Sequence, residues 1–269
     1  MAYWKDVWHF PNSNEYEIKW AGNYGAKGEK REKKKKASPE QIKKQNQLNR
    51  EKKMRRLIKA NFVPGDLWAT LKYPERTRKP PGEVIMDLSK FLRGMRTEYR
   101  KRMQEFKFIY RMEIGAHGGI HIHILLNRLK EGDTDLVLNN KWKPGRVNYE
   151  SVYECGGYEK LANYIVKQPE EGTEEYEQLS LFDAEEQKEF VRYSTSRNLI
   201  RPEPERKEYR RWTVRKLIKD GPEPTPGYYI DPNSIRCGVN RYTGMSYYYY
   251  TEVRIVEVNA RNGPGKEAE

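Results

Sequence analysis

The chain has 269 residues, of which 52 are Lys or Arg and 39 are Asp or Glu, so its formal net charge is +13. A chain of this length can bury a sizeable core, and the basic excess favours a polyanionic partner, nucleic acid first. No apolar run approaches the roughly 20 residues of a membrane-spanning helix, and the N-terminus lacks the apolar segment of a signal peptide. We therefore expect a nucleic-acid-binding protein with no membrane partner.

The cysteine content argues for a reducing compartment. Cys155 and Cys237 are too few and too isolated for a disulfide framework or a CxxC zinc site. We therefore expect a cytoplasmic protein. A zinc-stabilised structural protein is poorly supported by two cysteines and a single histidine cluster.

The N-terminal region, residues 1–60, is predicted to contain an edge strand followed by a basic helix. Alternation in residues 15–20 would place Tyr16, Ile18 and Trp20 together on an inward face. Ser38 as a cap and Pro39 at the first helical position predict a helix that ends near Ala60.

This helix lies in the most charged stretch of the chain. Residues 27–59 hold 15 Lys or Arg and four Asp or Glu. The one-signed excess favours an arm that follows a phosphate backbone, although a solubilising charged face is the alternative. The basic residues of this stretch that we expect to contact DNA are Lys33, Lys34, Lys35, Lys36, Lys43 and Lys44.

Residues 61–205 are predicted to form an α+β core in the order strand, helix, strand, strand, helix. Periodicity and turn residues give strands at 66–73, 107–115 and 119–127 and helices at 83–106 and 157–168. A further strand around 189–193 would extend this order to a ferredoxin-like or RRM-like antiparallel sheet with helices packed on it.

Two segments are predicted to lie outside the regular core. Residues 170–189 hold nine acidic residues and one Lys, which indicates an exposed acidic loop. Residues 206–269 are expected to form a C-terminal extension with a hairpin at 234–258 and disorder past Asn259. Its Tyr247 to Tyr250 run favours a tyrosine-rich strand, with base stacking as the alternative.

The most informative stretch is the strand that carries His121 and His123. Side chains alternate along a strand, so the two imidazoles share one face while Ile120, Ile122 and Ile124 share the other. Two neighbouring imidazoles on one face are suited to binding a metal ion. The alternative is a pair of polar side chains on the solvent face of a half-buried strand.

Glu113 lies on the preceding strand and could reach the same ion across the hairpin. A mixed nitrogen and oxygen ligand set fits Mn²⁺ or Mg²⁺, and Mn²⁺ tolerates imidazole better. A cross-strand ion pair between Glu113 and a basic residue is the alternative. His117, in the turn, is a reserve ligand or a DNA contact.

A nucleophile is expected on the helix at 157–168. Tyr164 and Lys167 are three residues apart and thus neighbours on one helical face. A nearby cation favours the phenolate form of a tyrosine that attacks phosphorus. A Tyr three residues before a Lys is also common in purely structural helices.

Together these motifs resemble those of the HUH endonuclease superfamily, specifically the rolling-circle replication-associated proteins of bacterial plasmids and phages. Residues 69–73 resemble its first motif, the stretch from Glu113 to His123 its metal motif, and Tyr164 to Lys167 its nucleophile motif. Residues 193–199, with Arg197, resemble a downstream Ser-Arg-x-Leu segment of Firmicute-type members. The likeness spans about residues 15–200.

The resemblance implies an HUH nuclease fold and a metal-dependent cleavage of single-stranded DNA at an origin, which in such proteins commonly contains a hairpin. Tyr164 would become linked to the 5′-phosphate and leave a 3′-OH for a host polymerase. Tyr158 lies almost opposite Tyr164 in helical azimuth, which predicts a one-tyrosine enzyme. No GxxxxGK[ST] stretch occurs, so no nucleotide cofactor site is expected and unwinding would fall to a host helicase.

Two other functions remain open from the sequence. A transposase or a conjugative relaxase of the same superfamily would share the chemistry. A catalytically silent, RRM-like nucleic-acid-binding protein would use the basic arm for affinity and the His pair for structure.

Overall fold

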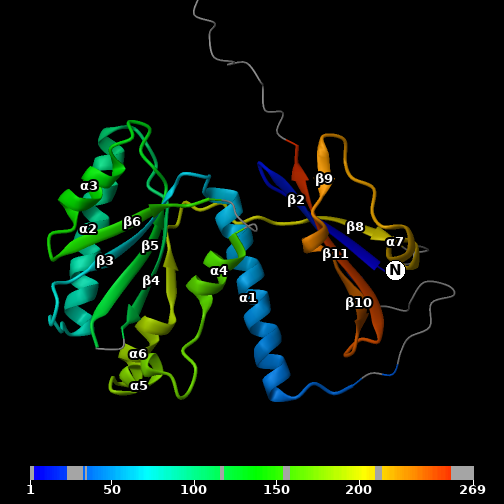
Figure 1. The fold of residues 1–269 in the computed structure, drawn as a ribbon, viewed down its shortest axis with the longest axis horizontal. Helices are drawn as coiled ribbons and strands as arrows, with labels where there is room; N and C mark the ends of the chain where they lie inside the picture. Colours follow the sequence, from blue (N-terminus) through cyan, green and yellow to red (C-terminus); the bar gives the residue numbers. More distant parts are fainter. Residues whose placement is uncertain are drawn as a thin grey trace, which may run out of the picture. The chain divides into compact units, whose positions relative to one another are not determined.

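The computed structural model describes residues 3–22, 33, 35–115, 118–153, 158–209 and 214–255. The chain forms two compact units, one from Met1–Ser38 and Pro202–Glu269 and one from Pro39–Arg201 (Figure 1). Antiparallel sheets combined with helices confirm the α+β class. The units differ from the expected ranges 1–60, 61–205 and 206–269, because both ends of the chain build one unit and the basic helix belongs to the other.

The first unit is built on a six-stranded sheet with strand order β10-β11-β2-β1-β8, in which β9 also pairs with β11. Its strands are β1 (Tyr3–His9), β2 (Ser13–Trp20), β8 (Glu205–Tyr209), β9 (Tyr228–Ile230), β10 (Arg236–Asn240) and β11 (Met245–Arg254). The short helices α7 (Arg215–Asp220) and η2 (Pro232–Ser234) complete the described part of this unit.

Strand β2 contains the alternation recognised at residues 15–20, but it is not an edge strand. It lies between β1 and β11, so the predicted edge position was wrong. Tyr16 and Ile18 are buried on one face as expected, and the ring of Tyr16 stacks on Tyr250 of β11 at 4.4 Å. The predicted C-terminal hairpin and its tyrosine-rich strand are confirmed as β10 and β11, whereas residues past Asn259 lie outside the described residues.

The second unit contains a five-stranded antiparallel sheet with strand order β6-β3-β5-β4-β7. Its strands are β3 (Leu67–Lys72), β4 (Phe108–Ile114), β5 (Ile120–Leu126), β6 (Arg146–Ser151) and β7 (Tyr193–Thr195). The predicted strands at 66–73, 107–115 and 119–127 are confirmed as β3, β4 and β5. Because β5 inserts between β3 and β4, the unit has the split β-α-β order expected for a ferredoxin-like arrangement.

Helices pack on both faces of this sheet (Figure 1). One face carries α2 (Pro81–Lys101) and α3 (Thr134–Lys141), whose apolar side chains bury Ile122 and Ile124 of β5. The opposite face carries α1 (Pro39–Asn61) and α4 (Glu159–Val166), which pack over Leu125 and Ile109. The alternation of β5 thus sends its isoleucines to one core and its histidines to the other face.

Two helices differ in length from those predicted. Helix α2 ends at Lys101 rather than near Phe106, because Met103 adopts a left-handed backbone (φ 53°) that cannot continue a helix. Helix α4 is shorter by about two residues at each end. The pattern of the sequence did not predict α3 or β6, which follow β5 in the chain.

The acidic stretch 170–189, expected as a loop, is largely helical. It contains α5 (Glu174–Ser180) and α6 (Ala184–Val191), which begin at the capping residues Thr173 and Asp183. Carboxylates in the first turn of each helix interact favourably with the helix dipole, so the charge supports helices here. Helix α6 also occupies most of 189–193, so the strand predicted there begins only at Tyr193.

Among the helices of the described residues, none combines the length and the apolar character that a membrane crossing requires.

Candidate active site

The strand pair β4 and β5 brings the predicted metal ligands to one face of the sheet. Glu113 lies opposite His121 in the register, and His123 lies between Arg111 on β4 and Thr70 on β3. Residues paired across antiparallel strands present their side chains on the same face. The pattern of the sequence therefore predicted correctly which side chains share this face.

Helix α4 places the predicted nucleophile against two of these side chains. The Tyr164 hydroxyl donates a hydrogen bond to Glu113 Oε2 and lies 2.9 Å from His123 Nε2. His123 Nε2 is in turn 2.8 Å from Glu113 Oε2, so the three polar atoms form a triangle. The phenol of a helix and the polar groups of the sheet thus meet at one point.

Two side chains of β3 hold the His123 ring in this orientation. Thr70 Oγ1 lies 3.1 Å from His123 Nδ1, on the side of the ring remote from the triangle. Trp68 stacks on the same ring at 5.7 Å between centroids and meets the Tyr164 ring edge-on at 5.8 Å. The hydrogen bond to one ring nitrogen orients the other toward Tyr164 and Glu113.

His121 lies on the same face but outside the triangle. Its half-buried ring lies over Gly115, where an added Cβ would come within 3.3 Å of the His121 Cε1 atom. In the described part of the chain, no three His, Cys, Asp or Glu side chains converge closely enough to hold a metal ion. The structure therefore joins two of the three predicted ligands, and His117 lies outside the described residues.

The electrostatics of the triangle favour a carboxylate beside a protonated phenol. Burial opposes the charge of Glu113, but its hydrogen bonds with His123 and Tyr164 outweigh this and lower its pKa to about 2. Burial and the hydrogen bond to Glu113 raise the pKa of Tyr164 above its ordinary value. Burial and the neighbouring Lys72 lower the pKa of His121, which favours a neutral ring.

Lys167 does not take the place that helical spacing suggested. It follows α4 with an extended backbone (φ −57°, ψ 136°), so the helix ends before a full turn has brought it beside Tyr164. Its side chain is exposed, and the raised pKa of Tyr164 has burial and Glu113 as its main causes. The expected stabilisation of a phenolate by Lys167 is therefore not present in this arrangement.

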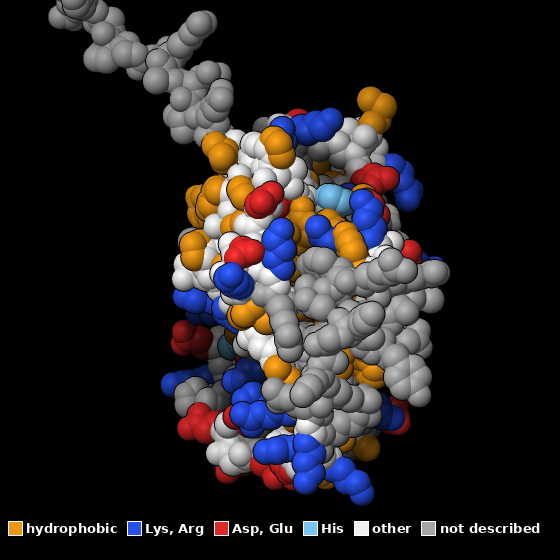
Figure 2. Space-filling view, turned by 90° about the vertical axis from the view of Figure 1, so that its right-hand side faces the viewer, with side chains coloured by type: hydrophobic (Ala, Val, Ile, Leu, Met, Phe, Trp, Pro, Cys, Tyr) orange, Lys and Arg blue, Asp and Glu red, His pale blue; other side chains and the backbone are white. Residues whose placement is uncertain are grey.

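The predicted DNA-contacting residues are divided between the two units. Lys33, Lys35 and Lys36 lie in the first unit, Lys43 and Lys44 lie on α1 in the second, and all five are exposed. Arg197 is exposed in the loop after β7, and Lys34 lies outside the described residues. On the face viewed in Figure 2, Lys and Arg side chains alternate with carboxylates and exposed hydrophobic side chains.

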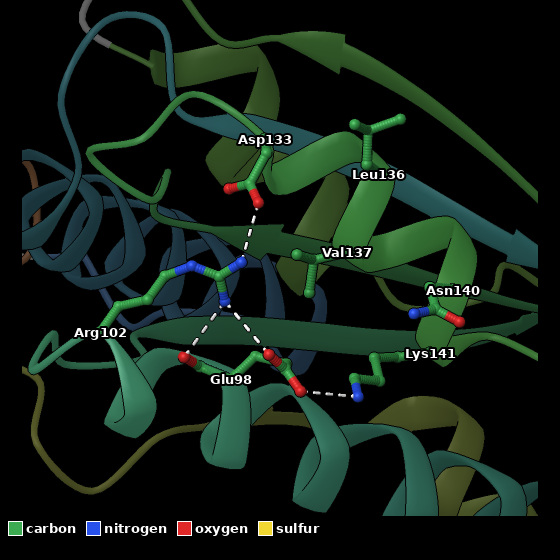
Figure 3. Close-up of a pocket in the computed structure, with 7 residues that line it drawn as sticks. All are labelled: Glu98, Arg102, Asp133, Leu136, Val137, Asn140 and Lys141. Atoms are coloured by element: carbon green, nitrogen blue, oxygen red, sulfur yellow. Dashed lines mark hydrogen bonds and ion pairs between the residues drawn. The ribbon is translucent and has the colours of Figure 1, made fainter.

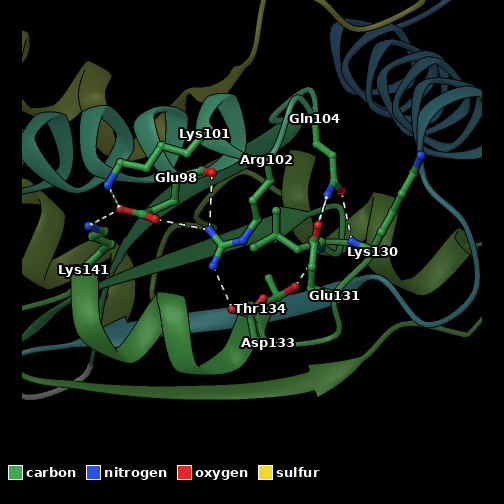
Figure 4. Close-up of polar contacts among 10 residues, drawn as sticks. Glu98, Lys101, Arg102, Gln104, Lys130, Glu131, Asp133, Thr134 and Lys141 are labelled. Atoms are coloured by element: carbon green, nitrogen blue, oxygen red, sulfur yellow. Dashed lines mark hydrogen bonds and ion pairs between the residues drawn. The ribbon is translucent and has the colours of Figure 1, made fainter.

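A shallow depression between α2 and α3 lies on the face of the sheet opposite the triangle. Its charged groups pair with one another, since Glu98 binds Lys141 and Arg102, and Arg102 also binds Asp133 (Figures 3 and 4). These ion pairs tie the two helices together. The depression therefore has a structural explanation that is separate from the candidate active site.

Sequence reasoning missed two residues that the structure adds to the site, Trp68 and Arg111. Trp68 precedes the recognised motif at 69–73 by one residue, and its place on the histidine face follows from the period of the strand. Arg111 is two residues before Glu113 and on the same face. The signal was the same alternation that identified the histidines, applied to the neighbouring strands.

Residues 66–169 match a family model whose description is that of a replication-associated protein of the ORF2 type. The matched range contains the described residues Thr70, Glu113, His121, His123 and Tyr164. No curated protein and no solved structure gave a significant match. The match supports a rolling-circle replication-associated protein, over the part of the chain that contains the candidate active site.

Proposed function

We propose that this protein initiates rolling-circle replication by nicking and rejoining single-stranded DNA through a covalent tyrosine intermediate. The observation that carries the proposal is the contact of the Tyr164 hydroxyl with both Glu113 and His123. A phenol at the centre of a carboxylate–imidazole pair is an arrangement suited to nucleophilic catalysis. The match to replication-associated proteins and the net charge of +13 support DNA as the substrate.

The side chains of the site fit a divalent cation. Glu113 Oε2 and His123 Nε2 are 2.8 Å apart, close to the roughly 3 Å between adjacent ligands of an octahedral ion. Thr70 holds His123 from its other nitrogen, as the outer partner of a metal-binding imidazole does. Glu113, His123 and, after a movement of its ring, His121 would hold Mn²⁺ or Mg²⁺, which would withdraw charge from a phosphate oxygen.

In the proposed reaction, the Tyr164 oxygen attacks the phosphorus while the bond from phosphorus to the 3′ oxygen breaks. The phenol proton leaves the Tyr164 oxygen, the departing 3′ oxygen gains a proton, and the 5′-phosphate stays on the tyrosine. Attack by a 3′-OH on this linkage restores the phosphodiester and the free tyrosine. Because one ester bond is exchanged for another, rejoining needs no external energy source.

Glu113 contributes mainly by orienting Tyr164. A carboxylate with a pKa of about 2 cannot retain the phenol proton at neutral pH, so the proton passes on to solvent or to the leaving group. Trp68 and Lys72 are half-buried on β3, the strand next to the histidines, and share the face of the sheet on which DNA would bind.

The test is covalent capture of DNA. The full chain is incubated with Mn²⁺ and 3′-labelled single-stranded oligonucleotides that tile the DNA flanking its own gene, and labelled protein is sought on a denaturing gel. The expected result is an adduct that Tyr164→Phe abolishes. Tyr158→Phe is the matched control, because Tyr158 is a buried tyrosine at the start of the same helix.

Each outcome decides between the functions under consideration. An adduct that depends on Tyr164 supports a nicking enzyme, and attachment sites at an inverted repeat beside the gene distinguish an initiator from a transposase or relaxase. Tight binding of the oligonucleotides without any adduct would indicate a non-catalytic nucleic-acid-binding protein. An adduct that survives Tyr164→Phe would refute the assignment of the nucleophile.

A further inference from the structure

Arg111 is a buried cation directly beside the candidate nucleophile. Its residue exposure is 2%, although a lone guanidinium in such a place would lose several kcal/mol of hydration. Three groups compensate for this loss. Arg111 Nη1 donates to the main-chain carbonyls of Tyr164 at 2.8 Å and Lys167 at 2.6 Å, and Nη2 pairs with Glu175 of α5 at 3.1 Å.

Two of these partners are at the C-terminal end of α4. The last carbonyls of a helix have no partner within the helix and carry the negative end of its dipole. The planar guanidinium presents several donors in a fixed geometry and can therefore bind two carbonyls at once. Arg111 thus fixes the position of the last turn of α4, and the carboxylate of Glu175 balances its charge.

Strand β4 consequently holds Tyr164 at both of its ends. Glu113 accepts a hydrogen bond from the side-chain hydroxyl, and Arg111 donates one to the main-chain carbonyl of the same residue. The two residues are two positions apart on one face of the strand, a separation of about 7 Å. This separation is comparable with the length of a tyrosine from its carbonyl to its hydroxyl.

We propose that Arg111 is a positioning residue that holds the end of helix α4 so that the Tyr164 oxygen lies at the reacting phosphate. The inference rests on the proposed function in so far as it concerns the reaction. It adds a residue outside the His, Glu and Tyr set, and it assigns to Glu175, in the acidic stretch, the role of fixing Arg111. Shifts of about 1 Å in a reacting group can cost about 100-fold in rate.

The test combines the rate of adduct formation with hydrogen exchange of the free protein. The variants are Arg111→Met, Arg111→Lys, which keeps a cation but loses the fork, and Glu175→Gln. At saturating oligonucleotide and Mn²⁺, we expect the rate to fall by about 100-fold for Met and less for Lys and Gln. The dissociation constant for DNA should stay unchanged, because the buried Arg111 does not face solvent.

Hydrogen exchange tests the tie without any reaction. In Arg111→Met, amides at the end of α4, including that of Lys167, should exchange faster than in the wild type. The matched control is Arg102→Met, which removes a guanidinium with two acidic partners between α2 and α3 and should change neither readout (Figure 4).

The outcomes separate this inference from the proposed function. A wild type that forms no adduct contradicts the proposed function, while faster exchange at the end of α4 in Arg111→Met would still support the tie. Wild-type rate and wild-type exchange in Arg111→Met would overturn the inference. If Arg111→Met fails to fold, Arg111→Lys decides, since an unchanged rate and unchanged exchange in that variant would equally overturn it.

Discussion

The Tyr164 hydroxyl donates a hydrogen bond to Glu113, the same carboxylate that we expect to bind a divalent cation. One oxygen of Glu113 and Nε2 of His123 therefore face the phenol in this structure. Binding of a cation by these two atoms requires the hydroxyl to move away from them. The phenol would in this way be released from its acceptor when the site takes up its metal.

Removal of the hydroxyl should therefore strengthen metal binding. We expect Tyr164→Phe to bind Mn²⁺ about tenfold more tightly than the wild type, since a hydrogen bond to a charged group is worth about 1.5 kcal/mol. Isothermal titration calorimetry with Mn²⁺ alone measures the change. The matched control is Tyr149→Phe, which removes a tyrosine–carboxylate hydrogen bond to Asp135 away from the site. Weaker Mn²⁺ binding by Tyr164→Phe would mean that the phenol is a ligand and not a competitor.

The sequence predicted the side chains of the site better than their exact contacts. His121, His123 and Glu113 were identified because strand periodicity alone decides which side chains share a face. The contact of Tyr164 with His123 was expected from the order of motifs. The position of Lys167 was wrong, because it assumed a further turn of helix, and that turn is absent where the main chain becomes extended.

The division of the chain into units could not be predicted from local patterns. Strand β1 pairs with β8, with Tyr3 opposite Tyr209, and β2 pairs with β11. Such pairings join segments about 200 residues apart, and neither periodicity nor turn residues carry information on them. Arg111 is a similar case, because its importance comes from the carbonyls of α4 and not from any motif.

Thr70 should matter through His123. Its hydroxyl is positioned to accept a hydrogen bond from Nδ1, which leaves Nε2 as the metal-binding nitrogen. We expect Thr70→Val, which keeps the shape of the side chain, to weaken Mn²⁺ binding by about tenfold. Thr97→Val is the control, because it removes an exposed hydroxyl that bonds a carbonyl on α2. Equal Mn²⁺ affinities for Thr70→Val and the wild type would show that this hydrogen bond does not set the state of His123.

The basic helix α1 should contribute to affinity for DNA in a salt-dependent way. Lys43 and Lys44 are exposed on it, and each phosphate contact on single-stranded DNA adds about 0.7 to the slope of log affinity against log salt. We expect the double variant Lys43→Gln with Lys44→Gln to lower this slope by about 1.4 in fluorescence anisotropy titrations of a labelled oligonucleotide.

The control for this measurement removes two charges from another helix. Lys90 and Arg93 are exposed on α2, which covers the face of the sheet opposite the histidines. Their replacement by Gln should leave the slope close to that of the wild type. Equal losses from both double variants would show that the DNA affinity reflects only the total charge of the protein and not a contact with α1.

The last prediction concerns stability and compares two glycines. A Cβ at Gly145 would clash with the main-chain oxygen of Lys72, which pairs with Arg146 where β6 begins beside β3. That oxygen belongs to the backbone of a paired strand and cannot move aside, so Gly145→Ala should destabilise the protein by about 2 kcal/mol. Gly82, in the first turn of α2, has no atom within 4 Å of an added Cβ, so Gly82→Ala should stabilise the protein by about 0.5 kcal/mol through helix propensity. Urea unfolding followed by circular dichroism measures both free energies of unfolding, and a Gly145→Ala variant as stable as the wild type would contradict the close approach of residue 145 to β3.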